Sequence, residues 1–231
     1  MGWDGAVNAH QVAPGVVRMG RREWVTEQGW SQALGEGYRT VVDLRSEIEF
    51  AVRRKGDANV SAAALDGLTV LHRPTEDPDH PGFDYPMGYL DHPADYAGYL
   101  EMFGDRVARA LLAVGHADGP VIVHCSAGRD RTGLVLSLGQ LVAGWSHDDI
   151  VDGYVAAAEG INAFQAHNPH PKETHKVGEE WEAWLGERVS ALRSFLDETN
   201  AVEFLRRQGA TDADIAAVAA RFDRTCDQPA E

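Results

Sequence analysis

A cysteine and an arginine in the middle of the chain are separated by five residues, a spacing that can place both side chains around one anion. A thiolate is a strong nucleophile, and the planar guanidinium fork of arginine matches two oxygens of a phosphate group. The spacing therefore predicts two-step covalent catalysis, in which Cys125 attacks a phosphate that Arg131 holds. The segment reads His124-Cys125-Ser126-Ala127-Gly128-Arg129-Asp130-Arg131-Thr132-Gly133.

The residues between these two suit a loop that binds an anion. Small residues that lead into a helix can turn successive backbone N–H groups inward, at the positive end of the helix dipole. The same groups would stabilise the thiolate relative to the thiol. We expect the phosphate to be bound by Ser126, Ala127, Gly128, Arg129 and Thr132. The hydroxyls of Ser126 and Thr132 would also stabilise the sulfur as it leaves, while His124 either orients the loop or is a core histidine with satisfied hydrogen bonds.

The leaving oxygen of a phosphate ester needs a proton donor within hydrogen-bond reach. Asp130, inside the loop, is the nearest carboxyl group in the sequence and is our predicted general acid. It could instead be a first-turn residue that interacts favourably with the helix dipole. Asp77, Asp79 and Asp84 are alternatives, because they lie in a proline-rich stretch that could close over a pocket as a lid.

The sequence around the loop predicts alternating strands and helices. Pro120–Val123 is typical of a central strand buried on both faces, and Thr132–Val142 is apolar nearly all round, as in a buried helix. Earlier in the chain, Val16–Met19 and Val41–Arg45 read as strands on either side of a helix over Thr26–Leu34. A loop between a strand and a helix is where open α/β sheets bind their ligands.

The remaining segments complete an α/β fold with helices on the faces of a central sheet. Apolar residues recur at helical spacing from Ala94 to Gly115, and Ser146 begins a capping box for a helix toward Ala158. Residues 73–93 hold five prolines and predict an ordered loop or lid. Residues 179–223 predict a helical tail with two helices. We expect one domain over residues 1–231.

The composition of the chain restricts which classes of partner it can bind and in which cellular compartment it is expected. The chain has 231 residues, a formal net charge of −15 and two cysteines, Cys125 and Cys226. Such an acidic chain argues against nucleic acid as a partner and against stable membrane association. Two isolated cysteines favour a reducing, cytoplasmic location. His167, His170 and His175 read as part of a solvated loop and not as a metal site, and no cofactor is expected.

The motif His-Cys-x5-Arg-Thr resembles the signature loop of the protein-tyrosine-phosphatase superfamily. The fuller segment from His124 to Gly133 resembles that of a bacterial branch described as tyrosine/serine or lipid phosphatases. This resemblance implies a protein-tyrosine-phosphatase-like sheet and a cysteine-dependent phosphatase. Asp130 matches the loop aspartate that is proposed as general acid in that branch. Arg129 stands where the branch has a lysine linked with phosphoinositide binding.

A second stretch also resembles that branch. Val41–Ser46 is similar to its early Asp-Leu-Arg strand end, which implies that Asp43 and Arg45 lie beside the phosphate loop. In that position Arg45 would add positive charge to the pocket and Asp43 would hold a basic side chain in place. A structural ion pair between the two residues is the alternative.

The expected activity is hydrolysis of phosphomonoesters through a cysteinyl-phosphate intermediate. The expected substrates are proteins bearing phosphotyrosine or phosphoserine, or a small phosphorylated metabolite. The alternative is a catalytically idle module that only binds phosphate. A rhodanese or arsenate reductase shares the reactive cysteine in an anion-binding loop, but arsenate reduction needs further cysteines and the chain offers only Cys226.

Overall fold

A five-stranded sheet lies at the centre of the fold in this computed structural model, which describes residues 1–85, 87–170 and 172–224. The strand order is β1-β2-β5-β3-β4, and only the pair β1 and β2 is antiparallel. The strands are β1 (His10–Ala13), β2 (Val16–Met19), β3 (Thr40–Asp43), β4 (Thr69–His72) and β5 (Val121–His124).

The central position of β5 agrees with the prediction from its apolar sequence. All four of its residues are buried, and parallel partners β2 and β3 cover its two edges. The register aligns the last residues of the parallel strands, so that Met19, His124, Asp43 and His72 form one row. The loops that follow these strands therefore leave from the same edge of the sheet. Strand β1, which pairs with β2, had not been predicted.

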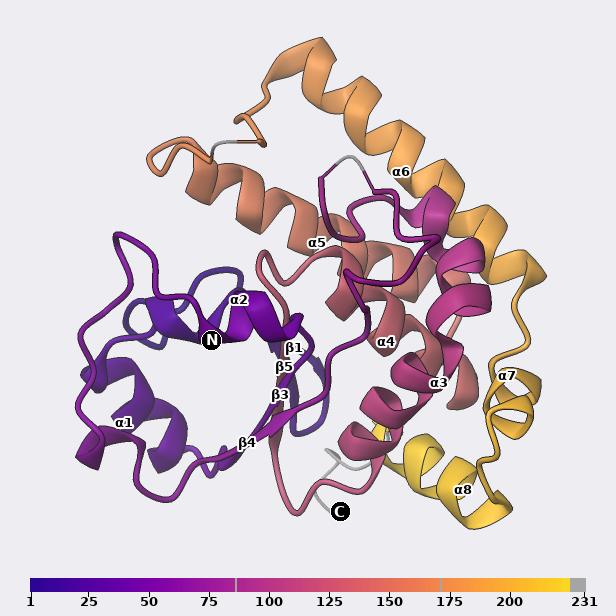
Figure 1. Ribbon diagram of the computed structural model, residues 1–231, viewed down its shortest axis with the longest axis horizontal. Coiled ribbons are helices and arrows are strands. Elements are labelled where there is room, and N and C mark those ends of the chain that lie inside the picture. Colours follow the sequence, from indigo (N-terminus) through magenta and orange to yellow (C-terminus); the bar gives the residue numbers. More distant parts are fainter. Residues whose placement is uncertain (86, 171, 225–231) are drawn as a thin grey trace, which may run out of the picture.

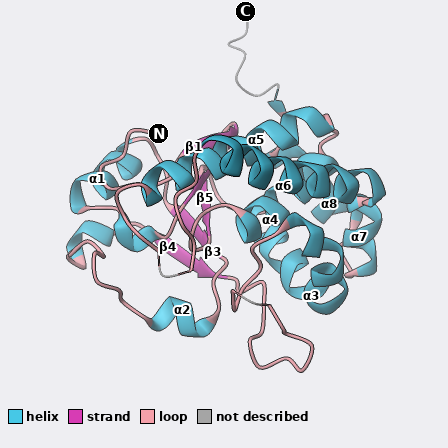
Figure 2. Ribbon diagram, turned by 90° about the horizontal axis from the view of Figure 1, so that it is seen from above, coloured by secondary structure: helices cyan, strands magenta, loops and turns pink. Residues whose placement is uncertain are grey.

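Helices cover both faces of the sheet (Figures 1 and 2). One face packs against α1 (Glu27–Gly35) and the N-terminal segment, with Trp3 and Trp30 in its core. The other face packs against a larger helical layer, whose buried residues come mainly from α3, α4, α5 and α6. The helices of that layer are α3 (Tyr96–Gly115), α4 (Asp130–Val142), α5 (His147–Gln165), α6 (Gly178–Glu198), α7 (Ala201–Arg207) and α8 (Asp212–Arg221).

The sequence missed three features of the helices. Helix α5 continues to Gln165, beyond the predicted approach to Ala158. The tail holds three helices and not two, because the Asn200 side chain accepts a hydrogen bond from the backbone N–H of Glu203 and starts α7. The short helix α2 (Glu47–Ala51) begins at Ser46 with a capping box that includes Glu49.

The proline-rich stretch is a loop, as predicted. Between the end of β4 and Pro93, where a short 3-10 helix begins, the described residues form no helix or strand. None of the helices in the described ranges combines the length and apolar character needed to span a bilayer.

Candidate active site

The loop after β5 connects the central strand to the first turn of helix α4. Cys125 follows the last residue of the central strand and is 3% exposed, and Asp130 begins the helix. Between them Gly128 has a φ of +72°, and a Cβ atom there would lie 2.2 Å from the backbone oxygen of Met19. Only glycine fits this turn, because a side chain would be both strained and in collision.

The loop turns its carbonyl groups outward. Every carbonyl from Cys125 to Asp130 accepts a hydrogen bond from a group outside the loop. In the described chain, the amide N–H groups of residues 126–129 donate to no protein acceptor. These N–H groups are therefore left for an anion. The donors to the carbonyls are His124 Nδ1 to Cys125 (2.9 Å), Arg21 N to Ser126 (2.8 Å), Asn8 Nδ2 to Ala127 (3.0 Å), Arg18 Nη2 to Gly128 (2.8 Å) and Arg129 (3.0 Å), and Tyr96 Oη to Asp130 (2.9 Å).

Arg18 is the main support of the loop and had not been predicted from the sequence. The side chain extends from β2, is 3% exposed and donates to three carbonyl groups, those of Gly128, Arg129 and Gly153. Burial lowers its pKa. The only sequence signal is a charged residue inside an otherwise apolar strand.

Two carboxylates hold the guanidinium of Arg131, and neither had been predicted. Nη1 donates to Glu49 Oε2 at 2.5 Å and to Glu76 Oε1 at 2.7 Å, and Nη2 donates to Glu49 Oε1 at 3.0 Å. The Nε–H group is buried and has no hydrogen-bond partner among the described residues. The edge formed by Nε and the second hydrogen of Nη2 is therefore open, and it matches two oxygens of a phosphate group.

The pKa values of Glu49 and Glu76 shift in opposite directions. Burial opposes ionisation of Glu49, but the charge of Arg131 outweighs it and lowers the pKa of Glu49 to about 2. Burial raises the pKa of Glu76, and the neighbouring Glu49 raises it further, against the effect of Arg131. Glu76 also accepts a hydrogen bond from Tyr99 Oη at 3.1 Å. Glu76 thus contacts both Arg131 and Tyr99, whereas Glu49 binds both terminal nitrogens of Arg131.

Asp130, the predicted general acid, lines the cavity at the loop and is 4% exposed. Both of its oxygens accept hydrogen bonds, Oδ1 from Tyr154 Oη at 2.9 Å and Oδ2 from Arg129 Nε at 2.6 Å. The three alternative aspartates do not line this cavity. Asp77 instead pairs with Arg106 at 2.9 Å.

Asp91 is a carboxyl group near the cavity that had not been predicted from the sequence. It follows Tyr89 and Leu90, which both line the cavity. Burial, followed by the negative charge of Asp130, raises its pKa to about 6. A carboxyl group with such a pKa is partly protonated near neutral pH and can act as a proton donor.

The side chain of Arg129 faces carboxylates. Nε donates to Asp130, and Nη1 and Nη2 donate to Glu173 at 3.1 and 3.3 Å. Its guanidinium carbon lies 5.1 Å from the ring centroid of Trp184 on α6. Arg129 thus connects the loop with the segment between α5 and α6.

Asp43 and Arg45 lie behind the loop and are absent from the cavity lining. Arg45 Nε donates to Asp43 Oδ1 at 2.9 Å, and Nη1 donates to Glu23 Oε2 at 3.0 Å. His124 Nε2 lies 3.3 Å from Asp43 Oδ2. Burial opposes ionisation of Asp43, but the charge of His124 and the hydrogen bonds from Arg45 and His124 outweigh it and keep its pKa below the usual range. The pair is a buried ion pair that supports the strand carrying Cys125.

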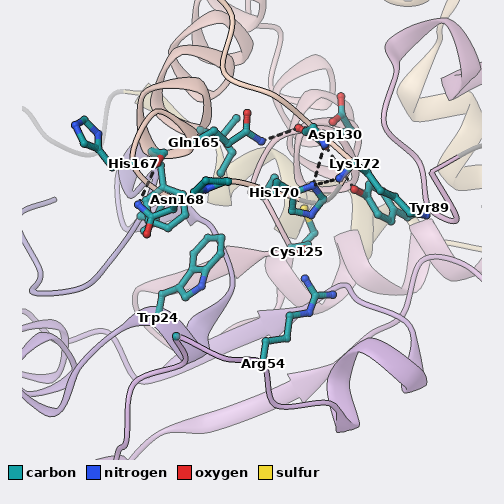
Figure 3. Close-up of a pocket in the computed structure, with 18 of the residues that line it drawn as sticks. Trp24, Arg54, Tyr89, Cys125, Asp130, Gln165, His167, Asn168, His170 and Lys172 are labelled. Atoms are coloured by element: carbon teal, nitrogen blue, oxygen red, sulfur yellow. Dashed lines mark hydrogen bonds between the residues drawn. The ribbon is translucent and has the colours of Figure 1, made fainter.

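The cavity above the loop has a volume of about 760 Å³. Cys125, Ser126, Ala127, Asp130 and Arg131 form its floor. Figure 3 shows Trp24 and Arg54 on one side of Cys125, with His170, Lys172 and Tyr89 on the other. The Trp24 and Phe164 rings lie 4.7 Å apart and give the cavity an aromatic wall. The Thr132 hydroxyl is buried and lacks a described partner, so it is available to the site.

The histidine-rich segment lies partly at the cavity. His167 and His170 line it, whereas His175 Nδ1 lies 2.9 Å from the backbone oxygen of Asn162. In the part of the chain that the structure describes, no group of three or more His, Cys, Asp or Glu residues is arranged to hold a metal ion. Cys226 lies outside the described residues.

Comparison with known proteins agrees with the chemistry of the loop. The family described as "Tyrosine phosphatase family" matches residues 3–223, nearly the whole chain. A stretch of 77 residues, 33% of the chain, is 39% identical to tyrosine-protein phosphatase Lar of Drosophila melanogaster. The match spans only 3% of the length of Lar.

Two solved structures are similar to this chain over most of its length. The Siw14 catalytic core is 16% identical with a TM-score of 0.49, over 87% of this chain and 90% of that one. TpbA of P. aeruginosa is 15% identical with a TM-score of 0.39, over 90% of this chain and 98% of that one. A variant of TpbA was solved in complex with pTyr.

Proposed function

The chain belongs to the tyrosine phosphatase family, and from this premise we propose that it hydrolyses phosphomonoesters through a cysteinyl-phosphate intermediate formed at Cys125. The family match and the cysteine in the anion-binding loop mark it as an enzyme of the cysteine-dependent phosphatase type. The observation that supports the mechanism most directly is the set of unused donors around Cys125. The amide N–H groups of residues 126–129 and the open edge of Arg131 all lack a described protein acceptor.

In the first step the thiolate of Cys125 attacks phosphorus, and the bond from phosphorus to the leaving oxygen breaks. The loop N–H groups and the Nε–Nη2 edge of Arg131 stabilise the charge on the phosphoryl oxygens in the transition state. The leaving oxygen takes a proton from a carboxyl group. In the second step water attacks phosphorus, the carboxylate takes back a proton, and the thiolate leaves. The hydroxyls of Ser126 and Thr132 stabilise the departing sulfur.

Two carboxyl groups are candidates for the proton donor. Asp130, which the sequence predicts, lines the cavity, and its two oxygens accept hydrogen bonds from Arg129 and Tyr154. Asp91 prefers its neutral form, with a pKa raised by burial and by Asp130 to about 6. A donor must be protonated and within reach of the ester oxygen when the bond breaks. Asp91 meets the first condition near pH 6 but does not itself line the cavity, whereas Asp130 lines the cavity, so both stay candidates.

The proposed substrates are phosphotyrosine or phosphoserine in proteins, or a small phosphorylated metabolite. The cavity of about 760 Å³ falls in the range of about 300–1,000 Å³ that is typical of sites for drug-sized ligands. Its wall holds Trp24 and Phe164, so it suits a substrate with an apolar or aromatic body.

The test is phosphate release in the presence of EDTA, with wild type compared with Cys125→Ser. The panel contains p-nitrophenyl phosphate, phosphotyrosine and phosphoserine peptides, and sugar phosphates. Turnover by wild type and its loss in Cys125→Ser, with an unchanged melting temperature, is the expected result. Phosphopeptide binding by wild type without turnover on any substrate would instead identify an idle phosphate-binding module.

A further inference from the structure

Three cations at the rim of the cavity have no carboxylate partner among the described residues. Arg54 and Lys55 come from the loop after α2, and Lys172 comes from the segment between α5 and α6. The Arg54 and Lys55 side chains form no hydrogen bond or ion pair with any described residue. Lys172 Nζ donates only to the backbone oxygen of Met87, at 2.6 Å. No carboxylate in the described ranges therefore pairs with any of the three.

The carboxylates of the cavity do not neutralise this group. Among the described lining residues, Asp130 and Glu173 are the carboxylates, and both bind Arg129. Glu173 also accepts a hydrogen bond from Gln165 at 3.0 Å. Arg131, on the floor, has carboxylate partners of its own. The three rim cations are therefore an excess of positive charge, in a chain whose formal net charge is −15.

The side chain of His170, which lines the same cavity, can act as a neutral hydrogen-bond donor beside these cations. His170 Nδ1 accepts hydrogen bonds from the backbone N–H groups of Lys172 and Glu173, at 3.2 and 3.1 Å. Since Nδ1 accepts, the proton of the neutral ring resides on Nε2, which can donate to an anion. Burial lowers the pKa of His170, and the charge of Arg54 contributes to this shift. Arg54 is thus electrostatically coupled to His170 across the cavity, where Figure 3 shows it pointing toward Cys125.

We propose that the substrate is a small soluble molecule with two anionic phosphate groups, of which Cys125 attacks one while Arg54, Lys55 and Lys172 bind the other. This inference rests on the proposed phosphatase function. A cleft lined by charge of one sign raises the local concentration of ligands of the opposite sign. A single phosphate on the loop would leave most of the cavity of about 760 Å³ unfilled and its rim cations unpaired. The acidic surface of the chain opposes docking on an anionic membrane, which favours a soluble substrate over a lipid headgroup.

The experiment compares kcat/KM for fructose 1,6-bisphosphate with kcat/KM for fructose 6-phosphate and fructose 1-phosphate. The variants are wild type, the double variant Arg54→Gln/Lys55→Gln, and Lys172→Gln. Arg53→Gln is the matched control, because Arg53 lies in the same loop, carries the same charge and does not line the cavity. Turnover of p-nitrophenyl phosphate is measured in parallel for each protein.

Wild type is expected to prefer the bisphosphate by at least about tenfold, the factor that one charge-assisted contact supplies. The double variant is expected to lose most of this preference, and Arg53→Gln to keep it. High salt should reduce the preference, because the rim cations are exposed.

Three results would overturn the proposal. If wild type has similar kcat/KM values for the bisphosphate and the monophosphates and turns over p-nitrophenyl phosphate normally, there is no second phosphate site, and the proposed phosphatase function still holds. If Arg53→Gln loses as much of the preference for the bisphosphate as the double variant does, the preference comes from general surface charge and not from a second phosphate site. A preference that appears only with phosphorylated lipids in vesicles replaces the soluble substrate with a headgroup. Absence of turnover on p-nitrophenyl phosphate refutes the proposed function itself.

Discussion

Replacing Glu49 by glutamine is expected to lower kcat/KM for p-nitrophenyl phosphate by about 10- to 100-fold. The two oxygens of Glu49 bind both terminal nitrogens of Arg131, at 2.5 and 3.0 Å. Glutamine keeps one acceptor oxygen and turns an NH₂ group toward the other nitrogen, so that two donors face each other. A hydrogen bond to a charged group contributes about 1.5–3 kcal/mol. Because each 1.36 kcal/mol is about a factor of ten in rate, the loss of one such bond gives the stated range.

The sign of the effect distinguishes two roles of Glu49. If Glu49 positions Arg131, glutamine lets the guanidinium turn and activity falls. If Glu49 instead competes with phosphate for the guanidinium, glutamine frees Arg131, KM falls and kcat/KM rises. The second bond partner, Glu76, remains in both cases and holds Nη1 at 2.7 Å. Arg131 should therefore stay in the site, and the change should affect the phosphate step more than the fold.

The assay is steady-state hydrolysis with separate values for kcat and KM, supported by a thermal melt. Glu47→Gln is the control, because Glu47 lies on the same helix with its side chain 80% exposed, against 14% for Glu49. Glu49→Asp keeps the charge and should retain more activity than Glu49→Gln. A rise in kcat/KM for Glu49→Gln, or an equal loss in Glu47→Gln, refutes the positioning role.

Two further predictions concern the loop and the proton donor. Gly128→Ala should abolish turnover and lower the melting temperature. The new Cβ atom would lie 2.2 Å from Met19 O, and the backbone φ of +72° is strained for alanine. Wild-type activity in that variant would contradict the loop geometry. If Asp91 is the donor, kcat for a phosphoserine peptide should fall as pH rises through about 6, where its carboxyl group loses the proton, and Asp91→Asn should remove this decline. A decline that survives in Asp91→Asn and disappears in Asp130→Asn would assign the donor role to Asp130, as the sequence predicts.

The central strand and the loop could be predicted because their signals are local. Val121, Ile122 and Val123 form a short apolar run before Cys125, and each is fully buried in β5. Gly128 stands in the loop where the chain must take a positive φ. Each of these features depends on neighbours within a few positions in the sequence.

The partners of Arg131 could not be predicted, because the fold brings them from distant parts of the chain. Glu76 lies 55 positions from Arg131 in the sequence and Glu49 lies 82 positions from it. They are two of the 36 acidic residues, and no pattern distinguishes them from exposed ones. Ser46 and Glu49 do match a capping box, and both of its hydrogen bonds are present. That motif indicates the start of a helix, but it says nothing about the arginine that the same carboxylate holds.

The distribution of free positive charge also depends on contacts between distant residues. Arg129 lies inside the loop, yet its guanidinium is bound to Asp130 and Glu173, so only its backbone N–H group is left for an anion. Arg54 and Lys55 belong to an ordinary basic run, yet no described carboxylate reaches them. The potential of a pocket depends on which charges remain uncompensated after folding. Which charges stay uncompensated depends on contacts between residues far apart in the sequence. Substrate preference therefore has to be argued from the residues at the rim of the cavity as well as from the motif on its floor.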